Sequence, residues 1–195
     1  MNTKTFLFVL CLSAVLGIGI SRIKNQTTAP KIQSKYSHLG GDFELTSTKG
    51  KVRLKNFHDK TVVLFFGFTF CPDVCPLTLS RFQNLFQKLT PKQQKNLQLL
   101  FVSVDWKRDT PKTVHDYVTY FNSQFIGLTG SQDEIDKIVK SYGAYYEFTP
   151  LEDSELKYTV DHTSKAYLIK NTKIVATIDD SLEEKEVKAL IERHL

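Results

Sequence analysis

Apolar positions change their spacing several times along the chain, and each change predicts a new element of secondary structure. An alternating pattern at residues 42–57 predicts a β-hairpin that turns at Lys49-Gly50. Unbroken apolar runs at 61–68 and 97–105 are typical of central strands that are buried on both faces. Apolar residues at helical spacing from Cys75 to Leu89 predict a helix directly after the first of these strands.

The second half of the chain continues the alternation of strands and helices. We expect a helix capped at Asp109-Thr110-Pro111 and then a strand at 125–130. A second helix should run from the capping box at Ser131–Glu134 to about Tyr142, followed by an irregular stretch or short hairpin at 144–160. The chain should end with two strands around Asn171-Thr172 and a helix at 182–194. This order predicts an α/β fold with a mostly parallel sheet that is flanked by helices on both faces. The terminal hairpin can add an antiparallel edge.

The N-terminal segment is not patterned like a globular domain. After Lys4, residues 5–20 carry no charge and are almost wholly apolar, and basic residues close the run. A helix of this run would be about 24 Å long, shorter than the ~30 Å core of a bilayer. We therefore expect residues 1–24 to be a cleaved secretory signal or a short retained membrane anchor. Residues 25–39 are predicted to be a linker and 40–195 the exported domain.

Composition and charge narrow the class of protein. The 195 residues are 41% hydrophobic and 24% charged, as in a folded domain with a single core. Residues 1–29 hold three basic residues and no acid, so +3 of the net charge of +5 lies there and +2 remains for the rest of the chain. Basic and acidic residues are interleaved in the body, which argues against nucleic-acid binding.

Cys71 and Cys75 are the candidate chemical groups of the body, since the third cysteine lies in the N-terminal apolar run. The pair follows the strand at 61–68, and chemistry in such sheets gathers at the C-terminal ends of the strands. Thiols at positions i and i+4 of a starting helix share a face, with Cα atoms about 6 Å apart. A helix N-terminus favours thiolates, so the pair can be oxidised or can bind a metal. A purely structural disulfide is a weaker explanation, because so short a loop adds little stability.

The spacer between the cysteines has three residues, one more than in thioredoxin-type dithiols. A wider pair suits two thiolates around a soft cation, which calls for a further ligand. His162 precedes a predicted buried strand, and its neighbours Asp161 and Thr163 can fix its tautomer. Its position alone leaves a ligand role and a surface role equally open. The histidines that we expect to be solvated surface residues are His38, His58, His115 and His194.

Four segments resemble the SCO/SenC family of copper-binding assembly proteins: FFGFTFCPDVCPLTLS, VSVDWKRDTP, FIGLTG and VDHTSKAYLIK. The resemblance covers about residues 40–195. It implies a thioredoxin-like fold, a copper site made by Cys71, Cys75 and His162, and a role in maturing the dinuclear copper centre of cytochrome c oxidase. It also implies that the N-terminal apolar segment is a membrane tether. Trp106 stands where the family commonly has proline, and this departure removes no implied ligand.

The resemblance leads to two hypotheses about function. The first is a membrane-tethered, monomeric copper chaperone that passes Cu(I), or also Cu(II), to the copper-receiving subunit of cytochrome c oxidase. Zinc is a competitor for such ligands, although a structural zinc site normally has four. The alternative is an enzyme, a thiol–disulfide oxidoreductase whose redox pair Cys71 and Cys75 keeps partner cysteines reduced. In either case we expect the domain on the exported side of a membrane, in the bacterial periplasm or the mitochondrial intermembrane space.

Overall fold

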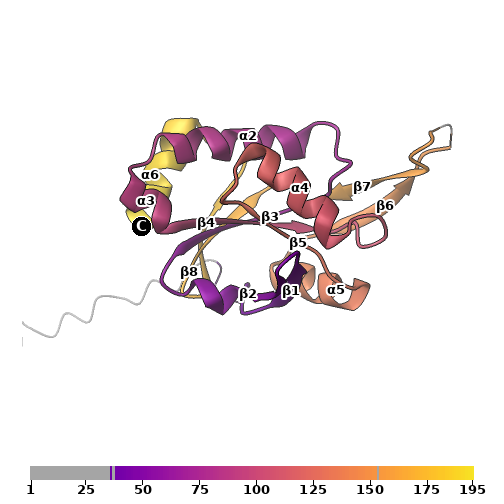
Figure 1. The fold of residues 1–195 in the computed structure, drawn as a ribbon, viewed down its shortest axis with the longest axis horizontal. Coiled ribbons are helices and arrows are strands. Elements are labelled where there is room, and N and C mark those ends of the chain that lie inside the picture. The colour runs from indigo at the N-terminus through magenta and orange to yellow at the C-terminus, as the bar shows by residue number, and fades with distance from the viewer. Residues whose placement is uncertain (1–35, 37, 153) are drawn as a thin grey trace, which may run out of the picture. The chain divides into compact units, whose positions relative to one another are not determined.

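A five-stranded mixed sheet, in the order β5-β4-β3-β8-β9, forms the centre of the domain (Figure 1). The computed structural model describes residues 36, 38–152 and 154–195, so the predicted signal or anchor and most of the predicted linker lie outside the described residues. β3, β4 and β5 run parallel, and the hairpin of β8 and β9 adds two antiparallel strands, as expected. The strands are β3 (Thr61–Gly67), β4 (Leu97–Ser103), β5 (Ile126–Leu128), β8 (Ala166–Lys170) and β9 (Lys173–Ile178).

Helices cover both faces of this sheet, as Figure 1 shows, with α2, α4 and α6 on one face and α5 with the β1–β2 hairpin on the other. Within the described part of the chain, no helix is long and apolar enough to cross a membrane. The elements are β1 (Glu44–Ser47), β2 (Gly50–Arg53), the 3-10 turn η1 (Leu54–Phe57), α2 (Val74–Gln87), α3 (Pro91–Lys95), α4 (Pro111–Phe121), α5 (Gln132–Ser141) and α6 (Glu184–His194).

The two faces of β3 belong to two separate apolar clusters. Val63 and Phe65 pack with Phe82 of α2, whereas Leu64 packs with Tyr142 beyond α5. Every residue of β3 and β4 is buried, because both faces are covered. Burial of a large apolar side chain contributes about 1.5–3 kcal/mol, so this doubly covered centre holds the end of β3 in place. The segment that carries the two candidate cysteines follows directly after that end of β3.

A second hairpin, made of β6 (Tyr146–Pro150) and β7 (Tyr158–His162), stands outside the main sheet. Figure 1 shows it extending past the end of the sheet near which α2 begins. The sequence predicts an irregular stretch or a short hairpin in this region, and the structure shows the hairpin. Its last residue, His162, leads directly toward β8, so the hairpin is tied to the centre of the fold at that point.

Two local details differ from the sequence analysis. The cap of α4 is Thr110, whose side chain accepts a hydrogen bond from the Thr113 N–H. Asp109, expected to share that cap, is instead buried and accepts hydrogen bonds from Thr69 and Ser103. The short helix α3 was not predicted, because it is a single capped turn without an apolar stripe. The predicted capping box at Ser131 is confirmed.

Candidate metal centre

Two thiols and one imidazole meet at the C-terminal end of β3. Cys71 lies in the turn after β3, Cys75 in the first turn of α2, and His162 at the end of β7. The Cys75 Sγ and His162 Nε2 atoms are 3.6 Å apart, although the residues are 87 positions apart in the chain. The three ligand atoms all lie within 4.8 Å of one another, and both thiols are free. In the part of the chain that the structure describes, no other group of three such residues is placed to hold a metal ion.

Gly67 makes room for this site, and the sequence analysis did not single it out. A Cβ atom at this position would lie 2.7 Å from the Cys75 Sγ and 2.6 Å from the Phe101 ring. A glycine that ends an otherwise β-branched and aromatic strand is the signal that could have found it, since such a glycine often marks a close approach. The absent side chain lets the sulfur sit directly over the end of β3.

The two thiols have opposite shifts in pKa. The pKa of Cys71 is lowered, chiefly because the Cys75 thiol donates a hydrogen bond to its sulfur, with further help from the Cys75 N–H, 3.4 Å away. The pKa of the fully buried Cys75 is raised, first by that same hydrogen bond and then by burial. The reduced pair at neutral pH is therefore one thiolate, Cys71, beside one thiol, Cys75.

The imidazole of His162 is held with one nitrogen facing the sulfurs. Its Nδ1–H donates to the Thr163 carbonyl oxygen at 3.0 Å, which leaves the lone pair of Nε2 toward Cys75. Thr163 is itself fixed, because its N–H and hydroxyl both bond to the backbone of Tyr145. Asp161, the other expected neighbour, instead accepts a hydrogen bond from Thr149 across the hairpin. The tautomer is thus set by the main chain.

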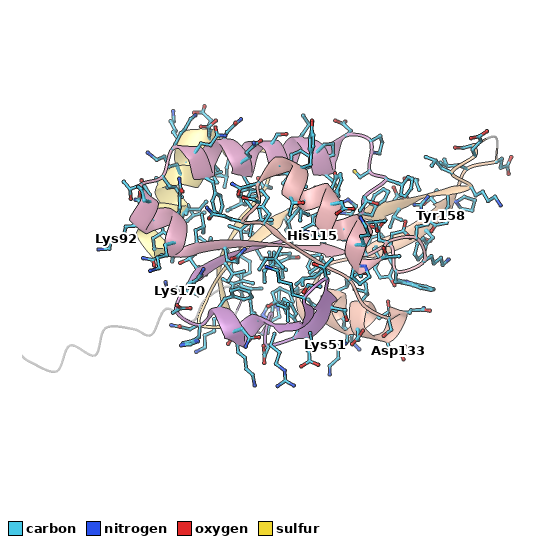
Figure 2. The ribbon with its side chains drawn as sticks, in the orientation of Figure 1. Lys51, Lys92, His115, Asp133, Tyr158 and Lys170 are labelled. Carbon is cyan, nitrogen blue, oxygen red and sulfur yellow. The ribbon has the colours of Figure 1, made fainter. Side chains whose placement is uncertain are left out.

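The remaining histidines lie away from this site. His38 and His58 are exposed. His115 is partly buried on α4, well apart from the hairpin that carries Tyr158 (Figure 2). His194 donates its Nδ1–H to the Leu190 carbonyl oxygen in α6. None of the four is brought together with Cys71 and Cys75.

The donor set fits a soft metal ion of low coordination number. Two sulfurs and one neutral nitrogen suit Cu(I), whereas a structural zinc site would ask for a fourth ligand. The site is not closed on its outer side, since Cys71 is half-buried and a hollow of about 220 Å³ lies over Cys71 and His162. Metal and partner can therefore reach the sulfur of Cys71 from solvent.

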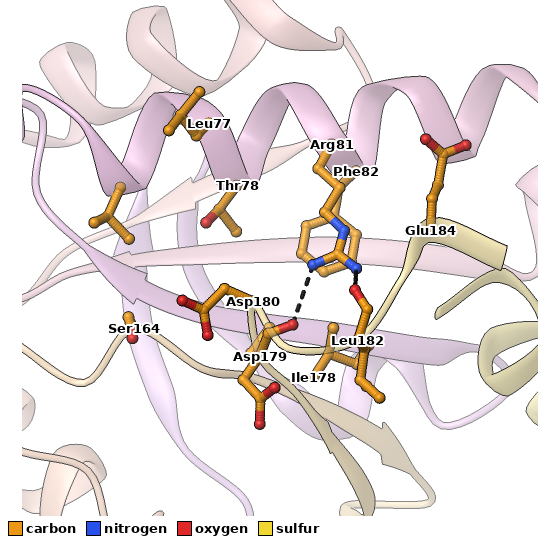
Figure 3. A pocket seen from close by; sticks show the side chains of 12 residues that line it. Leu77, Thr78, Arg81, Phe82, Ser164, Ile178, Asp179, Asp180, Leu182 and Glu184 are labelled. Carbon is orange, nitrogen blue, oxygen red and sulfur yellow. Dashed lines mark hydrogen bonds between the residues drawn. The ribbon is translucent and has the colours of Figure 1, made fainter. Parts of the chain in front are cut away.

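A longer groove of about 480 Å³ adjoins this hollow and shares Val74 and Ser164 with it. It runs between α2 and the connection from β9 to α6 (Figure 3). Arg81 spans the groove, because its guanidinium donates to the carbonyl oxygens of Asp179 and Leu182. The groove thus extends the accessible surface away from the candidate metal centre along α2.

Comparison with families of known proteins gives one clear match. The family model SCO1/SenC matches residues 31–195. Protein SCO1 homolog 1, mitochondrial, of Arabidopsis thaliana is 42% identical over 132 residues, which are 67% of this chain and 39% of that protein. Protein SCO1 homolog, mitochondrial, of Homo sapiens is 31% identical over 176 residues, which are 87% of this chain and 58% of that protein. The match thus spans less than two thirds of either relative.

Solved structures agree with this match and confirm the predicted thioredoxin-like α/β fold. Apo Sco1 from Thermus thermophilus has a TM-score of 0.74 at 36% identity, over 80% of this chain and 92% of that one. Bradyrhizobium japonicum ScoI with copper bound has a TM-score of 0.72 at 34% identity, over 80% and 99%. Yeast Sco1 with copper bound has a TM-score of 0.71 at 33% identity, over 80% and 87%.

Proposed function

The chain belongs to the SCO1/SenC family, and we propose that it is a copper chaperone for the assembly of cytochrome c oxidase. In this proposal Cys71, Cys75 and His162 bind one copper ion and release it to the copper-receiving subunit of the oxidase. The observation that carries the proposal is the meeting of three soft or borderline ligand atoms within 4.8 Å at the end of β3. The copper-bound structures of two similar proteins, from Bradyrhizobium japonicum and yeast, support it.

Copper capture follows from the protonation states of the three residues. The Cys71 thiolate is ready to bind without losing a proton. Cys75 has to release its thiol proton when the metal binds, because the thiolate and not the thiol is the ligand. His162 binds through Nε2, which the Thr163 carbonyl keeps free of a proton. Binding therefore releases about one proton per copper near neutral pH.

Copper release requires that incoming thiolates replace these ligands one at a time. A three-coordinate site leaves a side open for such exchange, and the half-buried Cys71 sulfur lies on that side. No electrons are transferred when Cu(I) moves from one set of thiolates to another. The exchange thus needs only contact between the two sites and reduced cysteines in the partner.

The surface around the candidate metal centre suits contact with a partner. Phe70, Val74 and Leu77 expose 48%, 41% and 66% of their surface. Large apolar side chains that cluster on a surface mark interaction sites. We propose that the oxidase subunit docks on these three residues: Val74 lines both the hollow and the adjoining groove, Leu77 lines the groove, and Phe70 directly precedes Cys71.

We propose that residues 1–24 hold the protein at a membrane, that 25–39 link them to the domain at 40–195, and that the domain faces the exported side. The apolar run after Lys4 supports this arrangement. Two relatives from Arabidopsis thaliana and Homo sapiens are described as mitochondrial. The compartment is then the intermembrane space in a eukaryote or the periplasm in a bacterium.

A second function, thiol–disulfide exchange, is favoured by the asymmetry of the two thiols. A half-buried thiolate at Cys71 beside a thiol at Cys75 is the arrangement of a dithiol reductant. Cys71 would attack a partner disulfide, and Cys75 would then displace the reduced partner and leave a Cys71–Cys75 disulfide. Such a reaction reduces the partner cysteines that later accept copper.

One experiment separates the two functions. The acceptor is the soluble domain of a copper-receiving oxidase subunit. In one mixture the Cu(I)-loaded protein meets the reduced acceptor, and copper transfer is measured. In the other mixture the copper-free, reduced protein meets the oxidised acceptor, and reduction of the acceptor disulfide is measured. Copper delivery is supported if the wild type transfers copper to the reduced acceptor and His162→Ala does not, because the variant retains too little copper. If His162→Ala returns the acceptor to its reduced, copper-binding form as well as the wild type does, while each cysteine variant fails, thiol exchange is the function and the copper proposal is wrong.

A further inference from the structure

A single guanidinium connects the two segments that carry the candidate ligands. The Cζ atom of Arg108 lies 3.7 Å from the ring centroid of Tyr158 and 4.9 Å from that of Phe70. Phe70 directly precedes Cys71, and Tyr158 begins the strand that ends at His162. Figure 2 shows Tyr158 on the projecting hairpin. Arg108 thus sits between the cysteine turn and the histidine strand.

Hydrogen bonds hold the Arg108 side chain in this position. Asp105 has no exposed surface, and its carboxylate accepts from the Arg108 Nε at 2.5 Å and from the Tyr158 hydroxyl at 2.8 Å. The Arg108 Nη1 donates to the main-chain carbonyl oxygens of Tyr158 at 3.1 Å and Leu156 at 3.3 Å. Three of these four hydrogen bonds are made with β7 and the turn before it, so they fix where the strand lies relative to the cysteine turn.

We propose that Arg108 is a positioning residue that sets the distance of His162 from the two sulfurs. This inference rests on the proposed copper-binding function, and it names the residue that holds the histidine ligand at the correct distance from the cysteines. A planar guanidinium is suited to the task, because it stacks on two rings while donating along its edge. A lysine side chain ends in a single ammonium group, which cannot stack on a ring as a plane and does not offer the forked set of N–H donors. Lysine at this position therefore does not replace arginine.

The loop that carries Arg108 also offers a matched control. Lys107 places its Nζ 3.9 Å from the Phe148 ring centroid, on the same hairpin. Its Nζ also lies over the Tyr158 ring, at the longer distance of 5.6 Å from the centroid, whereas the cation that faces Phe70 is Arg108. Lys107→Ala therefore removes a cation and its aromatic contacts from the same loop and hairpin, and it leaves the contacts of Arg108 with Phe70 and with the Tyr158 main chain in place.

The test is a double-mutant cycle on Cu(I) affinity, measured by competition with a colorimetric chelator. The proteins are the wild type, Arg108→Ala, Arg108→Lys, Lys107→Ala, His162→Ala and the double variant Arg108→Ala/His162→Ala. Loss of residues that orient a metal ligand typically weakens binding by about 10–100-fold. We expect both Arg108 variants to lose about tenfold in affinity, and Lys107→Ala to match the wild type. In the His162→Ala background, Arg108→Ala should cause no further loss.

The outcomes separate the inference from the function on which it rests. If Arg108→Ala weakens binding equally with and without His162, its effect does not pass through the histidine and the inference is wrong. It is also wrong if His162→Ala weakens binding while neither Arg108 variant does. If His162→Ala itself binds copper as the wild type does, the proposed ligand set has failed first. Arg108→Lys serves alone if Arg108→Ala does not fold, as circular dichroism will show.

Discussion

Replacement of Gly67 by alanine should displace the Cys75 sulfur in the candidate metal centre, in a direction and by a distance that the structure gives. The added Cβ would lie 2.7 Å from the Cys75 Sγ, whereas ordinary contact begins at 3.4 Å. One of the two atoms must therefore move by about 0.7 Å, the difference between these two distances. On the other side the Phe101 ring blocks a shift of the new Cβ, because it would lie only 2.6 Å away and it packs against Phe65 and Tyr117. We expect the Cys75 sulfur to be the atom that moves.

Two energies follow from this displacement. Overpacking of a core typically costs about 1–3 kcal/mol. An alanine in a strand recovers roughly 0.5–1 kcal/mol of that through its lower backbone entropy. Gly67→Ala should thus lower the free energy of unfolding of the apo domain by about 0.5–2 kcal/mol, measured by urea denaturation. Metal sites tolerate only about 0.2 Å of error in ligand distance, so Cu(I) affinity should also fall by about tenfold or more.

Gly127 of β5 supplies the control for this prediction. A Cβ there would lie 2.7 Å from both the Cγ1 and the carbonyl oxygen of Val114, an approach as close as that at Gly67 but against α4 and not against a sulfur. Gly127→Ala should therefore lower the stability of the domain and leave the Cu(I) affinity of the folded protein unchanged. The reasoning is refuted if Gly67→Ala binds copper as tightly as the wild type, or if Gly127→Ala loses as much affinity as Gly67→Ala.

Three further predictions concern the pH dependence, the docking surface and the hairpin. The pKa of Cys71 is lowered from 9.0 to about 4. A lowered pKa stabilises the folded state above that value, so the reduced apo domain should gain stability from about pH 4 toward pH 9 and lose it as the pH falls through 4. Urea titrations of the wild type and Cys71→Ser test this, and equal pH profiles would contradict it. Leu77→Glu should slow copper transfer to the oxidase subunit and leave the Cu(I) affinity unchanged in the chelator competition; an unchanged transfer rate would remove Leu77 from the docking surface. Trp106→Ala should destabilise the domain by about 1–3 kcal/mol, because the indole donates to the Tyr146 hydroxyl and packs on Phe148. Thermal unfolding checks this, and an unchanged midpoint would show that the hairpin does not depend on the indole.

The cysteine pair could be located from the sequence because its position is local. A buried strand followed within a few residues by a helix puts Cys71 and Cys75 at a strand end, and both spacing and proline placement are visible in the chain. The free thiols, and their placement with Cys75 inside the first turn of α2, agree with that expectation. The opposite pKa shifts were not predicted, because they depend on which sulfur is buried.

The third ligand could not be located from periodicity. His162 belongs to a hairpin that stands outside the main sheet, and its approach to Cys75 is set by its pairing with Tyr146 of β6 and its packing against Phe65 of β3 and Phe68. Its place before a predicted buried strand left a ligand role and a surface role equally open, and the resemblance to a known family then implied the ligand role. The structure brings it to 3.6 Å from the Cys75 sulfur.

Two polar residues with partners distant in sequence also escaped the sequence analysis. Asp109 follows a pattern that fits a helix cap, yet its carboxylate joins the cysteine turn, through Thr69, to the end of β4, through Ser103. Arg108 carries a long cationic side chain of the kind that normally faces solvent, yet it lies between two aromatic rings. Both roles depend on partners that are distant in sequence, and a single sequence does not reveal such partners.

The ligand set itself is the central claim, and X-ray absorption spectroscopy of the Cu(I)-loaded domain tests it most directly. We predict a three-coordinate copper with two sulfur ligands at about 2.2–2.3 Å and one imidazole nitrogen at about 2.0 Å, close to the distances of other thiolate and histidine sites. In His162→Ala the nitrogen shell should disappear and the two sulfurs should remain. A wild-type spectrum with sulfur ligands alone, or one that His162→Ala leaves unchanged, would contradict the account.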